Sequence, residues 1–254
     1  MPYARNNDVS IYYETIGRGA PLVMYHGLGD SGRGWYELGY VDALTKSRQL
    51  VLMDGRGHGR SSKPAEPSQY AVEHCVQDVL AVADDLGLRF FDYLGCSMGG
   101  WVGYGLARYA PQRLSALIIN GAHAFAQSLA PLRGLLAGDL DGWISFIHYH
   151  AGLTTAQVQQ LYGNDLHALQ ALVANDRPDL SSSLFSLECP CLFMAGSEDP
   201  LAPLVKRTAE RVPYSEYIEL KGLNHFSAIT RSSQALAAID RFLCPSMTLA
   251  LQAT

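Results

Sequence analysis

Short apolar runs alternate with segments of helical periodicity along most of the 254-residue chain. Most of these runs are continuous rather than alternating, which is typical of strands that are covered on both faces. Residues 9–14 differ, because their alternation and β-branched side chains favour a strand at a sheet edge. The predicted strands are residues 9–14, 22–25, 49–53, 90–94, 114–119, 191–194 and 217–220.

Apolar residues at helical spacing predict helices at residues 72–86, 98–109, 203–212 and 234–243. Strands that alternate with helices indicate βαβ units, and therefore an α/β protein with a mostly parallel, doubly wound sheet flanked by helices.

Residues 122–187 interrupt this alternation. They contain helix-like pieces at 142–150 and 155–173 and no convincing strand. We therefore expect a small helical cap over residues 122–187, inserted into a core that is formed by residues 1–121 and 188–254.

Composition and charge exclude several classes of protein. With 48% hydrophobic and 17% charged residues the chain is not disordered, and a net charge of −5 offers no basic surface for nucleic acid. No apolar segment reaches the roughly 18 residues of a membrane helix, and the N-terminus lacks the apolar core of a signal peptide. Five cysteines at irregular spacing do not form a disulfide framework. A cytoplasmic protein is expected, and its oligomeric state stays open.

Polar residues directly follow the predicted strands. In an open parallel sheet, ligands bind beyond the carboxyl ends of the strands, so these residues are expected to meet at one edge. They are His26, Asp54, Ser97, Asn120, Asp199 and His225. One serine with aspartates and histidines at one edge suggests acyl-transfer chemistry.

The most specific motif is Gly95-Cys96-Ser97-Met98-Gly99, a G-x-S-x-G sequence between a predicted strand and a predicted helix. Glycines on both sides of the serine permit a turn tight enough to hold it in an unfavourable backbone conformation. The Ser97 oxygen is then exposed at a helix N-terminus, where the helix dipole favours developing negative charge. Ser97 is therefore the candidate nucleophile.

This motif and four further ones resemble the α/β-hydrolase family over nearly the whole chain. The other four are His26-Gly27-Leu28-Gly29, similar to the oxyanion loop; residues 54–61, similar to the D-x-R-G-x-G-x-S turn; residues 196–199 with Pro203, similar to the acid loop; and residues 222–226, where the family carries its histidine. The chain order Ser, Asp, His also agrees. The resemblance implies the α/β-hydrolase fold with the cap inserted after the sixth strand.

The resemblance also implies roles for particular residues. Ser97 is the expected nucleophile, His225 the base that accepts its proton, and Asp199 the acid that orients the imidazole. The backbone N–H groups of Leu28 and Met98 are expected to bind the oxyanion. No cofactor and no metal is expected.

Asn224 departs from the family pattern, because a glycine often precedes the histidine. Since asparagine tolerates a left-handed backbone better than most residues, this departure is minor.

Other polar residues have competing interpretations. Glu198 competes with Asp199 for the acid role, but the spacing to Pro203 favours Asp199. Asp54 and His58 form a second possible pair, whose glycine-rich setting more often holds a turn together. His26 is expected to be structural.

The remaining candidates favour structural roles as well. His148 and His150 would diverge on a helix, so a metal pair is not expected there. Cys189 and Cys191 are expected to be buried thiols. Arg133 and Arg177 are candidates for a carboxylate clamp, although surface positions are favoured. The aromatic residues expected mainly in the core of the cap, with some lining an apolar pocket, are Phe125, Trp143, Phe146, Tyr149, Tyr162 and Phe185.

The sequence therefore favours a serine hydrolase that cleaves carboxylic esters of small to medium, mainly apolar substrates through an acyl-enzyme. A lactonase, a thioesterase and a carbon–carbon bond hydrolase stay open, because they use the same triad and differ in the cap and pocket. An alternative of another class is a ligand-sensing, receptor-like member of the family with little turnover. The expected partner is a small-molecule ester or lactone.

Overall fold

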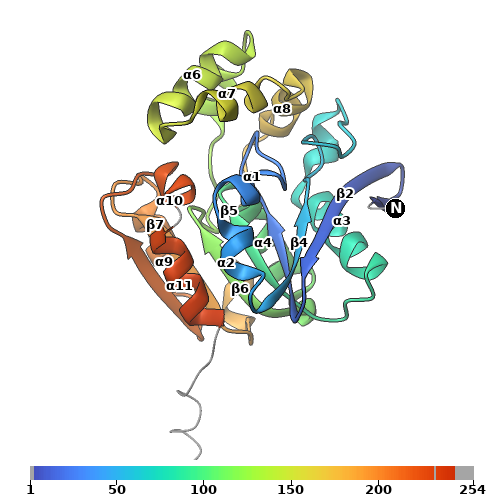
Figure 1. Cartoon of the computed structure of the whole chain (residues 1–254), viewed down its shortest axis with the longest axis vertical. Helices are drawn as coiled ribbons and strands as arrows, with labels where there is room; N and C mark the ends of the chain where they lie inside the picture. The colour runs from blue at the N-terminus through green and yellow to red at the C-terminus, as the bar shows by residue number, and fades with distance from the viewer. Residues whose placement is uncertain (1–2, 232, 244–254) are drawn as a thin grey trace, which may run out of the picture.

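A central β-sheet organises the computed structural model, which describes residues 3–231 and 233–243 (Figure 1). Within these residues the sheet has eight strands in the order β1-β2-β4-β3-β5-β6-β7-β8. Strand β2 runs antiparallel to both β1 and β4, and the pairs from β4 to β8 are parallel. The strands are β1 Tyr3–Asn6, β2 Val9–Gly17, β3 Ala20–Tyr25, β4 Arg48–Met53, β5 Phe91–Cys96, β6 Leu114–Asn120, β7 Cys191–Gly196 and β8 Ser215–Leu220. The predicted mostly parallel α/β sheet is confirmed.

The sheet is buried on both faces, because successive side chains of its inner strands enter two different cores. Val23 and Tyr25 of β3 belong to one apolar cluster, and Leu22 and Met24 belong to the other. Helices α3, α4 and α9 cover the first face, and α1, α2, α10 and α11 the second. The bounds are α1 Gly34–Glu37, α2 Tyr40–Leu44, α3 Val72–Asp85, α4 Met98–Tyr109, α9 Ala202–Ala209, α10 Ser227–Thr230 and α11 Ser233–Leu243, with single 3-10 turns η1 Pro67–Tyr70 and η2 Pro111–Arg113.

The prediction of an edge strand at residues 9–14 is wrong. Strand β1 pairs with β2 through a turn at Asn7 and takes the edge position. Only Ala4 of β1 is buried, so this strand has no apolar run by which the sequence could have indicated it. The short helices α1 and α2 also lie outside the predicted elements.

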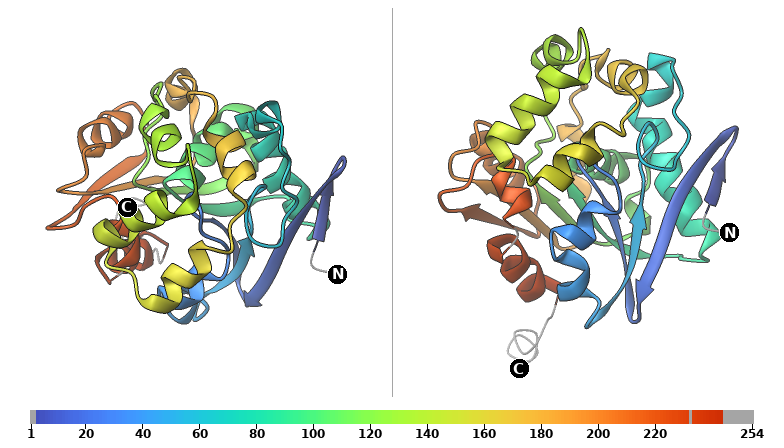
Figure 2. Two further views of the ribbon diagram at one scale, coloured as in Figure 1. Left: turned by 90° about the horizontal axis from the view of Figure 1, so that it is seen from above. Right: turned by 45° about the horizontal axis from the view of Figure 1, so that its top comes forward.

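Four helices lie between β6 and β7 and form a layer over one edge of the sheet (Figures 1 and 2). Leu136, Trp143 and Leu169 belong to an apolar cluster of this layer, and Leu28 and Leu172 pack against both it and the sheet core. The helices are α5 Ala130–Leu135, α6 Leu140–Ala151, α7 Thr155–Leu161 and α8 Leu166–Val173, followed by the 3-10 turn η3 Ser181–Ser186. We refer to α5–α8 as the upper helices. The division of the chain into a core and a cap at 122–187 stays a prediction.

Residues 3–231 and 233–243 include no helix that is both long enough and apolar enough to cross a membrane. The same residues contain no cluster of three His, Cys, Asp or Glu side chains placed to hold a metal ion.

Candidate active site

Ser97 lies in the turn between β5 and α4, with φ 51° and ψ −105°. In the described part of the chain, Asn7 is the one other non-glycine residue with a positive φ. The two motif glycines leave no room for a side chain: a Cβ at Gly95 would lie 2.3 Å from the Gly99 oxygen, and one at Gly99 would lie 2.2 Å from the Tyr25 oxygen. The strained turn expected from the G-x-S-x-G motif is therefore present.

Ser97, His225 and Asp199 form a continuous chain of hydrogen bonds. The Ser97 Oγ lies 3.0 Å from Nε2 of His225, and Nδ1 of His225 lies 2.8 Å from Oδ2 of Asp199. Because an ionised carboxylate only accepts, the Nδ1–H donates to Asp199 and leaves Nε2 free to accept from the serine. The fold thus brings together three side chains from the loops after β5, β7 and β8.

Asp199 and its neighbour Glu198 differ sharply in environment. The Asp199 side chain is fully buried, and its second oxygen accepts from the Leu201 N–H at 2.8 Å. Glu198 is exposed, and its backbone N–H donates to the Leu223 carbonyl. Only Asp199 therefore contacts the histidine.

The loop of residues 26–29 after β3 lies directly against the Ser97 turn. A Cβ at Gly27 would lie 3.7 Å from the Ser97 Cβ, and the Gly99 N–H donates to the His26 carbonyl at 3.1 Å. The amide of Met98 begins α4, so it has no preceding helical turn to bond to. The loop that contains Leu28 and the amide of Met98, which the resemblance assigned to the oxyanion, thus both lie next to Ser97.

His26 fastens this loop to the turn that follows β4. Its Nε2 accepts from the Gly55 N–H at 3.0 Å, while its Nδ1 lies 2.7 Å from the Gly27 oxygen and donates to it. Burial lowers the pKa of His26 to about 4, so the ring is neutral and suited to donating on one side and accepting on the other.

Asp54 and His58 do not bond to each other. The Asp54 carboxylate accepts from the Gly32 and Arg60 N–H groups, both at 2.8 Å. The His58 ring packs against the His26 ring at 5.0 Å, and burial lowers the pKa of His58 to about 3. Their contacts are those of residues that hold turns together.

The turn after β4 also contains a buried ion pair that the sequence analysis did not identify. Arg56 donates from Nε and Nη2 to the two Asp78 oxygens at 2.5 and 2.6 Å, and Asn6 donates to Asp78 at 2.8 Å. Asp78 lies on a predicted helix 22 residues away, and no local signal pairs the two. This pair anchors the turn to α3.

Asn224 does not have a positive φ, which among the described non-glycine residues only Asn7 and Ser97 have. Its Oδ1 accepts from the N–H groups of Phe226 and Ser227 at 3.0 and 2.8 Å. Its Nδ2 donates to the His150 carbonyl at 3.1 Å. Asn224 therefore holds the turn that leads into α10 and ties the His225 loop to α6.

The aromatic residues between 122 and 187 divide into three groups. Trp143 is fully buried, while Phe146 packs against Phe226, the neighbour of His225, at 5.7 Å. Phe125 lies under the guanidinium groups of Arg207 and Arg211. The expectation of a core position is wrong for three exposed residues, which are Tyr149, Tyr162 and Phe185.

The other structural expectations have mixed outcomes. Cys189 and Cys191 are buried free thiols, as predicted. His148 is exposed and His150 packs against Phe146, so the two rings do not converge. Arg133 is partly exposed and pairs with Asp176 at 2.9 Å.

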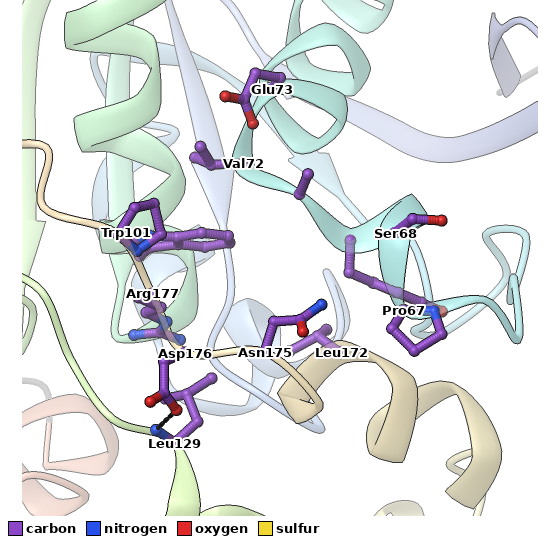
Figure 3. A pocket seen from close by; sticks show the side chains of 13 residues that line it. Pro67, Ser68, Val72, Glu73, Trp101, Leu129, Leu172, Asn175, Asp176 and Arg177 are labelled. Atoms are coloured by element: carbon purple, nitrogen blue, oxygen red, sulfur yellow. Dashed lines mark hydrogen bonds between the residues drawn. The ribbon is translucent and has the colours of Figure 1, made fainter.

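Arg177 is partly buried and lies away from the open surface. Its side chain lines a cavity below the upper helices (Figure 3). Burial lowers the pKa of Arg177 to about 10, which leaves the guanidinium charged at neutral pH.

Comparison with known proteins agrees with the fold. A family model described as alpha/beta hydrolase fold matches residues 20–190. The "Putative carbamate hydrolase RutD" of Azorhizobium caulinodans is 27% identical over 91% of this chain and 94% of its own. An esterase from a Rhodococcus species is 25% identical, with a TM-score of 0.82 over 95% of this chain and 97% of its own. An enzyme described as degrading N-acyl homoserine lactones is 26% identical, with a TM-score of 0.78 over 95% of this chain and 100% of its own.

The family match covers more than half of the chain and includes both the residue 26–29 loop and the Ser97 turn. The chain belongs to the alpha/beta hydrolase fold family.

Proposed function

We propose that the protein is a serine hydrolase that cleaves carboxylic esters or lactones of small to medium size through an acyl-enzyme. The observation that carries this proposal is the pair of hydrogen bonds from Ser97 to His225 and from His225 to Asp199, at 3.0 and 2.8 Å. The esterase and the lactone-degrading enzyme among the similar structures support the substrate class.

The acylation step follows from which of these three residues donates and which accepts a proton. His225 Nε2 takes the Ser97 hydroxyl proton as Oγ bonds to the substrate carbonyl carbon. Asp199 stabilises the resulting imidazolium. The oxyanion accepts from the Leu28 and Met98 N–H groups, each worth about 3–4 kcal/mol in comparable sites. The bond to the leaving oxygen then breaks, and that oxygen takes the proton from Nε2.

Deacylation repeats the same steps with water. His225 removes a proton from water, the hydroxide oxygen bonds to the acyl carbon, and the bond to Ser97 Oγ breaks as Oγ recovers the proton. The free acid leaves and the enzyme returns to its first state. A carbamate would react by the same attack on a carbonyl carbon, so carbamates belong in the substrate panel.

The test is turnover of p-nitrophenyl esters, lactones, thioesters and carbamates by the wild type and by Ser97→Ala. We expect Ser97→Ala to lose at least about a thousandfold in kcat while its melting temperature stays unchanged. Ser186→Ala, which changes an exposed serine on η3, is the matched control and should keep full activity. Activity of Ser97→Ala within tenfold of wild type, or one burst without turnover by the wild type, would overturn the proposal.

A further inference from the structure

A cavity of about 170 Å³ lies between the first turns of α3 and α4 and the segment that follows α8 (Figure 3). An engineered protein cavity of about 150 Å³ holds a benzene molecule, so this space is large enough for a small organic group. Apolar side chains from three elements, Val72, Leu129 and Leu172, form part of its wall. Arg177 adds a charged group to this wall, and Trp101 adds an aromatic ring.

Arg177 is held in place, yet most of its donors are open. Its backbone exchanges hydrogen bonds with Gln127 at 2.9 and 3.0 Å, and its Nη1 donates to the Gln127 Oε1 at 3.1 Å. The guanidinium lies 5.1 Å from the Trp101 ring centroid, and Figure 3 shows the two side chains together at one end of the cavity. Among residues 3–231 and 233–243, no carboxylate lies within ion-pair distance of it. A guanidinium has five N–H donors, so most of them are available to a ligand.

Trp101 gives the Arg177 guanidinium an aromatic face. The residue is only 8% exposed and its Nε1 is fully buried, so the indole offers its ring to the cavity and not its N–H. A guanidinium that lies over an aromatic ring keeps its in-plane N–H groups available as donors.

The acidic residues at the cavity already have donors of their own. Asp176 accepts from the Leu129 N–H and from Arg133, both at 2.9 Å. Glu73 accepts from the Tyr109 hydroxyl at the exposed end. The unpaired charge of the cavity is therefore positive, which selects an anionic group.

The position of Trp101 relates this cavity to Ser97. The backbone N–H of Trp101 donates to the Ser97 carbonyl at 3.1 Å, so the two residues are one helical turn apart, about 6 Å along α4. The cavity, which Trp101 lines, therefore lies beside the helical turn that begins at Ser97.

We propose that this cavity binds a carboxylate through the Arg177 guanidinium, which lies over the Trp101 ring. The substrate class rests on the function proposed above. The substrates are then esters or lactones that carry a carboxylate in addition to the bond that is cleaved. This assignment replaces the mainly apolar substrate expected from the sequence by one that carries a negative charge.

A binding experiment tests the site without requiring turnover. Ser97→Ala protein is titrated with glutarate and with glutaramide, its uncharged analogue, by calorimetry. Glutarate should bind, and adding Arg177→Met should weaken its Kd by about 10- to 100-fold. Arg207→Met, which removes a guanidinium stacked on Phe125 outside this cavity, is the matched control. Equal binding of glutaramide, or glutarate binding that Arg177→Met does not weaken, would overturn the site.

Kinetics test whether the carboxylate belongs to the substrate. The mono-p-nitrophenyl ester of glutarate is compared with p-nitrophenyl pentanoate, which has the same acyl length. Arg177→Met should raise KM for the charged ester by about 10- to 100-fold and leave the neutral ester unchanged. Free glutarate should inhibit pentanoate hydrolysis competitively. Equal effects of Arg177→Met on both esters, or noncompetitive inhibition, would overturn the substrate class.

The two proposals fail separately. Glutarate binding that depends on Arg177, without hydrolysis of any ester by the wild type, would overturn the hydrolase function and retain the carboxylate site. Hydrolysis of neutral esters together with Arg177-independent binding would overturn the carboxylate site and retain the hydrolase function.

Discussion

The Trp143 indole of α6 lies directly on Gly29 of the loop after β3, so closely that a Cβ at Gly29 would lie 2.0 Å from the indole Cη2. Asn164, in the loop between α7 and α8, donates from its side chain to the Gly29 carbonyl at 2.8 Å. The upper helices therefore hold the loop whose Leu28 amide we propose binds the oxyanion. Since a displaced donor no longer stabilises the transition state, the packing of these helices bears directly on catalysis.

Gly29→Ala should lower kcat by at least about tenfold, because the new methyl group displaces either the loop or the indole. Gly39→Ala is the matched control: Gly39 has φ 76°, close to the 80° of Gly29, and nothing lies within 4 Å of its added Cβ. Ester turnover and melting temperature of both variants separate the collision from backbone strain. Adding Trp143→Ala to Gly29→Ala should restore part of kcat, and a strictly additive loss would contradict this account.

Asp199→Asn should lower kcat by about 10⁴-fold with little change in melting temperature. An amide in this position can hold the imidazole in the tautomer that leaves Nε2 protonated, and such a ring is no base for Ser97. Glu198→Gln is the control next to it in the chain, and it should keep nearly full activity because its side chain is exposed. If Glu198→Gln were the more damaging change, the assignment of the acid would be wrong.

Asp78→Asn should lower the free energy of unfolding by about 3–5 kcal/mol, because it leaves the buried Arg56 guanidinium without its carboxylate. Glu216→Gln breaks the exposed pair with Arg241 and should cost less than about 1 kcal/mol. Urea unfolding of the two variants provides the comparison. Similar losses in both would show that burial of the Arg56 pair is not the deciding factor.

Stability in acid should depend on His58 and Asp30 in opposite directions. Burial lowers the pKa of His58 to about 3, so between about pH 6.5 and 3 the unfolded chain binds more protons and stability falls as pH falls. Burial raises the pKa of Asp30 to about 7, so between about pH 3.8 and 7 the folded chain binds more protons and stability falls as pH rises.

His58→Asn, which retains a donor near the Arg56 carbonyl, should therefore flatten the loss of stability between pH 6 and 4 by up to about 1.4 kcal/mol per pH unit. Asp30→Asn should steepen it over the same range. Urea unfolding at pH 7, 6, 5 and 4 measures both slopes, with His74→Asn, an exposed histidine, as control. Identical slopes for all three variants and the wild type would refute the assignment.

Local patterns in the sequence were sufficient for the parallel sheet and for the three loops that carry Ser97, Asp199 and His225. A continuous apolar run reports burial on both faces of a strand, and the glycines around Ser97 report a turn that admits no other residue. Each of these signals is contained in a few consecutive residues, because the burial or the tight turn that causes it acts within one element. Strand β1 escaped prediction since its side chains are mostly exposed and it is held by pairing with β2.

Tertiary structure alone decided the contacts between distant segments. Arg56 meets Asp78, Trp143 covers Gly29, and Asn224 reaches the His150 carbonyl, although each pair is separated by 22 residues or more. The same holds for Arg177. Its guanidinium lies over the Trp101 ring and lines a cavity, because the segment after α8 folds back beneath the upper helices. A charged side chain looks alike in the sequence whether it faces water or a cavity, and only the packing around it determines whether it is free to bind a ligand.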